Sequence, residues 1–168
     1  MKFKSIISSH IQEHKNVLNS FNDEMIEKIE DISNILVKAL SSGNTIFWCG
    51  NGGSAGDSQH LAAELIGRFK DDRKPLKSIA LTTDTSAITC ISNDFSYNKI
   101  FERQIEGLGV EGDILVGIST SGNSENIINA IKKCKTIGVK SICLLGKDGG
   151  KVKSLADHSI IIDSNSTA

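Results

Sequence analysis

A histidine and a glutamate, His60 and Glu64, are the residues whose types and spacing most directly suggest chemistry. Positions i and i+4 lie on one face of a helix, so the imidazole and the carboxylate would be neighbours. Such a pair can work as an acid/base unit or can share one metal ion. The ordinary alternative is a helix-surface pair without function, and the spacing alone leaves both interpretations open.

The helix that would carry this pair follows a glycine-rich turn, GNGGS at 50–54. A strand that ends in glycines and turns into a helix presents backbone N–H groups and the positive end of a helix dipole, which favour an anion. The pattern Gly50-x-Gly52-x-x-Ala55 also fits a loose dinucleotide fingerprint, but the acidic residue expected ~20 positions later is lacking. Asn51 and Ser54 add polar side chains that a dinucleotide turn does not need. A purely structural turn remains the alternative.

A second loop, STSGNS at 119–124, concentrates hydroxyl groups around a glycine. The hydroxyls belong to Ser119, Thr120, Ser121 and Ser124. Together with the N–H groups at a helix start, they suit a phosphate without a basic residue. An N-cap at Ser124 would explain one hydroxyl, but it explains four in one short loop poorly. Since no GK[ST] sequence follows, a nucleoside triphosphate P-loop is not supported.

A third polar pair, Asn93-Asp94, follows an expected short helix. These residues are typical of a helix end and turn. They are also suited to recognising sugar hydroxyls. Both interpretations stay open.

The elements that must position these residues alternate between helix and strand. Apolar periodicity predicts helices over 4–42 (with a break near 19–23), 54–69, 86–92, 97–108, 125–137 and 151–156. Apolar runs predict strands at 45–49, 76–81, 113–118, 140–145 and 159–162. This alternation predicts a parallel sheet covered on both faces, with ligands bound at the carboxyl ends of the strands. Both glycine/serine loops fall there.

Composition excludes several classes of function. The chain has 168 residues and a net charge of −1, which predicts one domain and no general attraction to nucleic acid or anionic membranes. Its apolar runs are far shorter than the ~20 residues of a membrane helix, and no secretion signal is visible. Four cysteines without paired spacing favour reduced core thiols in a cytoplasmic protein: Cys49, Cys90, Cys134 and Cys143.

Four motifs carry a family resemblance: CGNGGSAGDSQHLAAELIGRF, LTTDTSAITCISNDF, GDILVGISTSGNS and LLGKDGG. With these motifs the chain resembles the bacterial phosphoheptose isomerases, SIS domain enzymes that convert sedoheptulose 7-phosphate to D-glycero-D-manno-heptose 7-phosphate for lipopolysaccharide or capsule. The resemblance implies a single flavodoxin-like SIS domain over 1–168. It would consist of an N-terminal helical segment (1–43) and a three-layer α/β core (44–168) with five parallel strands. It also implies a homotetramer with active sites at subunit contacts.

The resemblance also implies roles for individual residues. Phosphate would be held by Ser119, Thr120, Ser121 and Ser124. The sugar would be held by Asn51, Gly52, Gly53, Asn93 and Asp94, with Ser54 of the same turn as a further substrate-binding candidate. Glu64 would be the catalytic carboxylate, and His60 and Glu64 would be ligands of one zinc ion per subunit. Two more active-site residues, a glutamine and a histidine, would stand on a C-terminal helix beginning near 164–168.

The resulting hypothesis is an aldose–ketose isomerisation in which Glu64 moves a proton between C1 and C2, with His60 and zinc organising the site. Two other classes of protein share the loops. A related SIS protein acts as a scaffold that binds the bacterial replication initiator, but it lacks a carboxylate at the position of Glu64. A regulatory module that binds sugar phosphates would keep the serine loop and need no base. Neither a nucleic acid nor a membrane is an expected partner.

Overall fold

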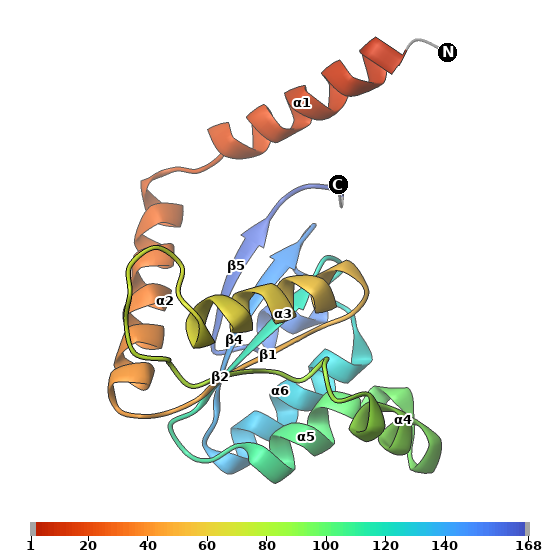
Figure 1. Cartoon of the computed structure of the whole chain (residues 1–168). Coiled ribbons are helices and arrows are strands. Elements are labelled where there is room, and N and C mark those ends of the chain that lie inside the picture. The colour runs from red at the N-terminus through yellow and green to blue at the C-terminus, as the bar shows by residue number, and fades with distance from the viewer. Residues whose placement is uncertain (1–2, 167–168) are drawn as a thin grey trace.

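The computed structural model describes residues 3–166, which fold around a five-stranded sheet in which every pair of neighbouring strands is parallel (Figure 1). The strands run in the order β2-β1-β3-β4-β5. Their bounds are β1 Ile46–Gly50, β2 Ser78–Ala80, β3 Ile114–Ser119, β4 Lys140–Gly146 and β5 His158–Ile162. All five strands that the apolar runs predict are present, and β2 is shorter than expected.

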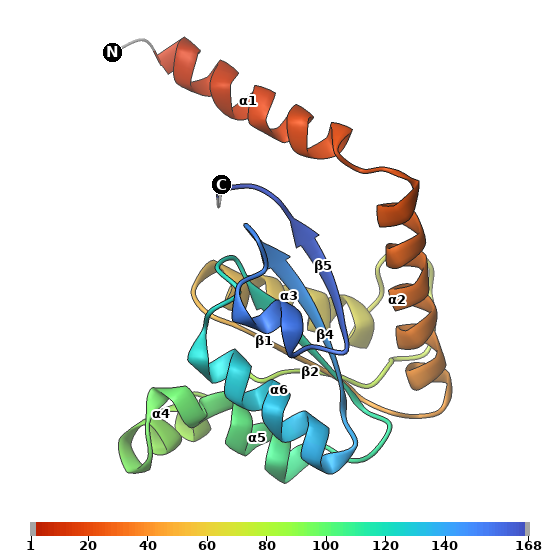
Figure 2. The ribbon, with the colours of Figure 1, turned by 180° about the vertical axis from the view of Figure 1, so that it is seen from behind.

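Helices cover both faces of the sheet, which confirms the predicted three-layer α/β sandwich (Figures 1 and 2). Those of the described residues are α1 Phe3–Asn19, α2 Asp23–Ser41, α3 Gly53–Ile66, α4 Thr85–Asp94, α5 Ile100–Leu108 and α6 Glu125–Ile137, with 3-10 turns η1 Tyr97–Lys99 and η2 Lys151–Ser154. α2 and α3 lie on one face, and α4, α5 and α6 lie on the other.

Strand β1 shows why its sequence reads as an almost continuous apolar run. Phe47 and Cys49 pack into the core under α5 and α6, while Ile46 and Trp48 pack into the core under α2 and α3. Every residue of β1 is buried. A strand covered on both faces needs apolar side chains at consecutive positions, because alternate residues point to opposite faces.

The helix after β1 ends before the predicted bound at 69, and Ile66 and Phe69 do not belong to its buried side. α3 stops at Ile66, and these two side chains are 49% and 70% exposed. The guanidinium of Arg73 donates to the backbone carbonyls of Glu64 and Leu65 at 2.8 and 2.9 Å. It thereby satisfies two of the carbonyl groups that a helix end leaves unpaired.

Two other boundaries differ from expectation near the polar pair. Asn93 and Asp94 are the last residues of α4 rather than a break after it, and the predicted helix over 97–108 begins with η1 before α5. Asp84 is the N-cap of α4, since its carboxylate accepts a hydrogen bond from Ala87 N at 2.9 Å. Capping by a carboxylate explains why α4 begins one residue earlier than the periodicity indicates.

Strand order places the two polar loops beside each other. The chain passes from β1 outward to β2 and then returns to place β3 on the other side of β1. Gly50 and Ile118 are register partners at the ends of β1 and β3. In doubly wound sheets a ligand crevice forms at this point, where the connections leave in opposite directions.

Helix α1 contributes no buried residue to the fold. It passes over the carboxyl end of the sheet (Figure 1), and it exposes the apolar side chains of Phe3, Ile7, Ile11 and Leu18. None of the helices within residues 3–166 is both long enough and apolar enough to cross a membrane.

Candidate functional site

The glycine turn after β1 is a tight reversal that only glycine permits at Gly50. A Cβ at this position would lie 2.5 Å from the carbonyl oxygen of Ser54, so the strand could not pass so close to the helix that follows. Gly52 has φ of +57° and precedes the first residue of α3. Ser54 N and Ala55 N donate to the carbonyls of Asn51 and Gly52 at 3.1 and 3.0 Å, so the turn itself satisfies these donors at the start of α3.

The serine loop after β3 is held by its own hydroxyl groups. The buried Ser119 Oγ accepts a hydrogen bond from Gly122 N at 3.1 Å and lies 3.2 Å from Ser124 Oγ. Ser121 Oγ accepts from Asn123 N at 3.2 Å. Although Ser124 is the N-cap residue of α6, its side chain makes no capping bond. Its hydroxyl is therefore directed into the loop and is not used up in ending the helix.

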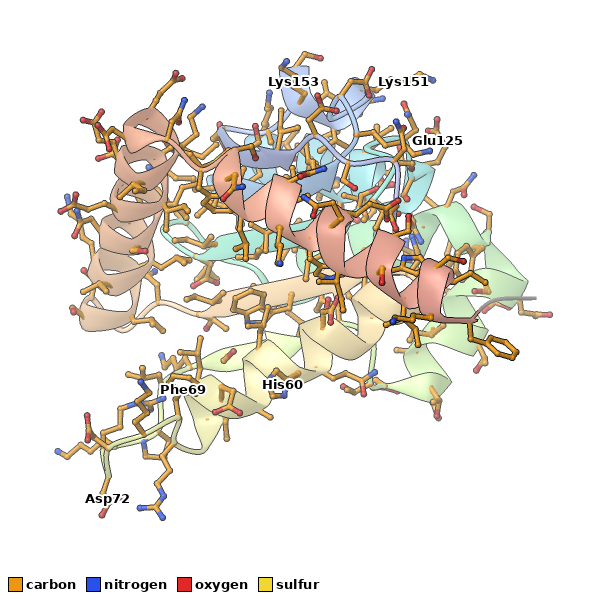
Figure 3. All side chains as sticks on the ribbon, turned by 90° about the horizontal axis from the view of Figure 1, so that it is seen from above. His60, Phe69, Asp72, Glu125, Lys151 and Lys153 are labelled. Carbon is orange, nitrogen blue, oxygen red and sulfur yellow. The ribbon has the colours of Figure 1, made fainter. Side chains whose placement is uncertain are left out.

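A second loop supports the serine loop from outside. Val152 N donates to the carbonyl of Gly122 at 2.9 Å, and Lys151 N donates to Asn123 Oδ1 at 3.2 Å. Gly122 has φ of +62°, and a Cβ there would collide with the backbone of Gly149. These contacts explain why the segment Gly146–Ser154 is rich in glycine. Figure 3 places its Lys151 close to Glu125, the first residue of α6, and their charged groups are 3.8 Å apart.

Asn51 of the glycine turn is joined to the helix that follows the serine loop. Its carboxamide and that of Asn126 exchange two hydrogen bonds, of 3.0 and 2.8 Å. The hydroxyl of Tyr97 donates a third bond, of 2.9 Å, to Asn51 Oδ1. Sequence reasoning missed Asn126 and Tyr97, although the position of Asn126 directly behind the serine loop could have drawn attention to it.

The pair Asn93 and Asp94 is exposed at the end of α4. Asn93 Nδ2 donates to Asp94 Oδ1 at 2.9 Å, and the Cys90 thiol lies 3.4 Å from Asp94 Oδ2. These donors, Asn93 first, hold the pKa of Asp94 below its usual value. Asp94 is therefore an ionised acceptor at neutral pH, which suits sugar hydroxyl groups as well as a helix end.

His60 and Glu64 are neighbours on α3, as their spacing predicts. His60 Nε2 lies 3.7 Å from Glu64 Oε1, with the imidazole 71% and the carboxylate side chain 31% exposed. Both line a groove of about 490 Å³ between α2 and α3. The groove is otherwise mainly apolar and includes Leu36, Val37, Trp48, Leu61 and Phe69.

The structure of one chain does not bring this pair and the serine loop into one pocket. No residue of 119–124 lines the groove that holds Glu64. Figure 3 shows His60 on α3 well apart from Glu125 and Lys151, which mark the start of α6 and the supporting loop. The predicted site residues thus form three groups: the glycine turn with the serine loop, the exposed pair Asn93 and Asp94 at the end of α4, and the His60–Glu64 pair.

The donor chemistry of His60 and Glu64 suits zinc, but the pair supplies only two ligands. Zinc in proteins takes three or four protein ligands. Among the described residues no group of three histidine, cysteine or carboxylate side chains is arranged to hold a metal ion. The two side chains are therefore at most part of a zinc site, and no catalytic step can be derived through a metal from this geometry.

Replacing Ser124 with alanine separates a capping role from a ligand role. A hydroxyl that caps a helix contributes ~1 kcal/mol of stability. Because Ser124 makes no capping bond, we expect the urea midpoint of Ser124→Ala to stay close to that of the unmodified chain. Its affinity for inorganic phosphate, measured by calorimetry, should fall by roughly tenfold, the scale of one hydrogen bond to a charged group. A lower midpoint with unchanged phosphate affinity would show a cap only.

The comparisons with known proteins agree on one family. The SIS domain family matches residues 9–146. The phosphoheptose isomerase of Aliarcobacter butzleri is 50% identical over 98% of this chain and 87% of its own length. That of Clostridium acetobutylicum is 51% identical over 96% of this chain and 81% of its own. The solved phosphoheptose isomerase of Neisseria gonorrhoeae superposes with a TM-score of 0.91 at 36% identity, covering 99% of this chain and 90% of that one.

Proposed function

Because the chain belongs to the SIS domain family and, within it, to the phosphoheptose isomerases, we propose that it converts sedoheptulose 7-phosphate to D-glycero-D-manno-heptose 7-phosphate. The product would supply heptose for lipopolysaccharide or capsule, and the enzyme would work in the cytoplasm. The observation that carries the proposal is the serine loop facing the glycine turn at the point where β1 and β3 meet.

The serine loop is the proposed grip on phosphate. Ser119, Thr120, Ser121 and Ser124 supply hydroxyl donors, and the start of α6 adds N–H groups and a favourable dipole. Phosphate held there would fix the far end of the sugar. The glycine turn, with Asn51 to Ser54, and the pair Asn93-Asp94 would then bind the hydroxyl groups. Binding energy from this remote end positions the carbons that react.

Glu64 is the proposed base. Starting from the ketose, Glu64 removes a proton from C1. The C–H electrons form the C1–C2 double bond as the C2 oxygen gains a proton. The resulting enediol loses the proton on O1 and receives one at C2, which gives the aldose. The half-exposed carboxylate of Glu64, with His60 beside it, fits the transfer of a proton to and from a substrate.

A second copy of the chain is proposed to complete the site. In one chain Glu64 faces the α2–α3 groove and the serine loop faces elsewhere, so a site that uses both needs groups from a subunit contact. The unburied helix α1, with its exposed apolar side chains, offers surface for such a contact. We expect a homotetramer in sedimentation velocity. A fully active monomer would contradict this assembly.

One zinc ion per subunit is proposed as the cofactor. His60 and Glu64 would supply two of its ligands. Bound zinc would stabilise negative charge on the substrate oxygens. Elemental analysis after dialysis should find about one zinc per subunit in the unmodified protein and much less in His60→Ala. Equal zinc content in both proteins would remove His60 from the ligand set.

An isomerase assay with sedoheptulose 7-phosphate tests the proposed function. Turnover to the aldose is the expected result. A scaffold that binds the replication initiator, or a regulatory module, would give no product; the regulatory module would still bind the sugar phosphate in calorimetry. The presence of Glu64 favours the enzyme over both.

A further inference from the structure

We propose that Asn126 and Tyr97 are positioning residues that hold the glycine turn and the serine loop at a set separation. With Asn51 they form a carboxamide clasp, defined as the three side chains of Asn51, Tyr97 and Asn126 and their three mutual hydrogen bonds. For its activity measurement this inference rests on the proposed function. It assigns a task to two residues that would not themselves touch the reacting carbons.

Asn126 is the buried centre of the clasp. It is 2% exposed, and its Oδ1 accepts from both Asn51 Nδ2 and its neighbour Ile127 N at 3.0 Å. Its Nδ2 donates to Asn51 Oδ1 at 2.8 Å. A buried amide whose partners are all in place rigidifies its surroundings, and removing one partner leaves the other unsatisfied. The clasp therefore holds Asn51 in one orientation.

The clasp adds a side-chain link between two segments whose strands are already paired up to Gly50 and Ile118. Asn51 lies in the turn after β1, whereas Asn126 is the second residue of α6, directly behind the serine loop. The two are 75 residues apart in sequence. A sugar phosphate that spans both loops needs their separation set closely, because displacement by ~1 Å can cost ~100-fold in rate. A direct side-chain link between the loops sets that separation.

Ile127 N can only donate, so its bond to Asn126 Oδ1 fixes the Asn126 amide and through it the Asn51 amide. Tyr97 adds a further bond that stabilises this orientation. Its hydroxyl donates to Asn51 Oδ1 at 2.9 Å, so that oxygen takes two donors, one from η1 and one from α6. The turn η1 is itself fixed to α6, because Asn129 Nδ2 donates to the Asn98 carbonyl at 3.0 Å. With Oδ1 committed in this way, one amide hydrogen of Asn51 remains to donate to a sugar hydroxyl.

If the three side chains of the clasp act as a unit, the kinetic losses of the single and double variants differ from those of independent residues. If Asn51 acted only as a direct sugar contact, removing Asn126 would leave that contact in place. The losses in kcat of the two single variants would then multiply in the double variant. If the clasp acts as a unit, removing either amide releases the turn, and removing both adds little more. Phosphate held by the serine loop alone should be almost indifferent, because that loop keeps its own internal bonds.

The test is a double-mutant cycle with Asn51→Ala, Asn126→Ala and the double variant, with Tyr97→Phe alongside. We expect each alanine variant to lose about tenfold to 100-fold in kcat for sedoheptulose 7-phosphate, with a smaller change in KM. The double variant should lie within about threefold of the worse single one. The inhibition constant of inorganic phosphate should change less than threefold. Thr136→Ala, a hydroxyl at the far end of α6, is the control.

Amide hydrogen exchange gives a readout that does not need activity. Peptides covering Gly50–Gly56 should exchange faster in Asn126→Ala and in Tyr97→Phe. Their exchange rate should be unchanged in Thr136→Ala. If the unmodified protein proves inactive, the proposed function fails while exchange still tests the clasp. If Asn126→Ala does not fold, Tyr97→Phe carries the same exchange test. Unchanged exchange of the turn, or kinetic losses that multiply in the double variant, would overturn the inference.

Discussion

Replacing Glu64 with glutamine should lower kcat by at least ~100-fold, the contribution expected of a general base. The substitution keeps the size of the side chain and removes its negative charge, and with it the ability to take a proton and the ion pair with His60. The bonds from Arg73 to this turn of α3 use the carbonyl oxygen of Glu64, so they survive the change. We therefore expect an unaltered urea midpoint and an unaltered affinity for inorganic phosphate, since phosphate is held at the serine loop.

The matched control is Glu30→Gln, which makes the same chemical change at an exposed position on α2. It should keep full activity. Turnover by Glu64→Gln close to that of this control would remove Glu64 from the mechanism. A loss of activity together with a lower urea midpoint would indicate instead that the carboxylate supports the fold.

Replacing Gly122 with alanine should have the next largest effect, because it deforms the proposed phosphate grip. The left-handed φ of +62° costs a residue with a Cβ about 1–2 kcal/mol. The added carbon would also collide with the backbone of Gly149, which is not free to yield like a flexible side chain. The loop must then move, and the hydroxyls of Ser119 and Ser124 can no longer bind the same phosphate. We expect phosphate affinity to fall by ~100-fold, measured by calorimetry, with a parallel rise in KM.

Gly107→Ala provides the control for this substitution. Gly107 lies in α5, where an added Cβ meets nothing within 4 Å. Alanine is the better helix former there and should stabilise the protein by roughly 0.5–1 kcal/mol without a change in KM. If Gly122→Ala bound phosphate as well as Gly107→Ala does, the serine loop would not be the phosphate site.

The fold was predictable because its central strands are covered on both faces. A segment such as 45–49 must then be apolar at consecutive positions, and its alternation with helical segments indicates a parallel sheet. The errors fall at helix ends. Phe69 lies within the predicted helix 54–69, but the helix stops at Ile66, and Arg73 donates to the carbonyls of Glu64 and Leu65 in its last turn. A contact of that kind leaves no periodic signal.

The candidate site was only partly predictable for a related reason. The serine loop can be recognised in the sequence by its residue types and by its place after a strand. Asn126 and Tyr97 cannot be recognised in this way, because they bond to Asn51 from 75 and 46 positions away in sequence. Spacing along one helix predicts that His60 and Glu64 are neighbours, and they are. It says nothing about whether that helix face meets the serine loop, and in one chain it does not share a pocket with it.

Conversion of sedoheptulose 7-phosphate in D₂O, followed by proton NMR for the unmodified protein and for Glu64→Gln, tests directly whether Glu64 is the base of a phosphoheptose isomerase. We predict that the unmodified protein forms the aldose with deuterium at C2, since the enediol is protonated there by a base that exchanges with solvent. We predict that Glu64→Gln forms at most ~1% as much in the same time. Absence of the aldose with the unmodified protein would exclude the isomerase, and equal formation by the two proteins would exclude Glu64 as its base.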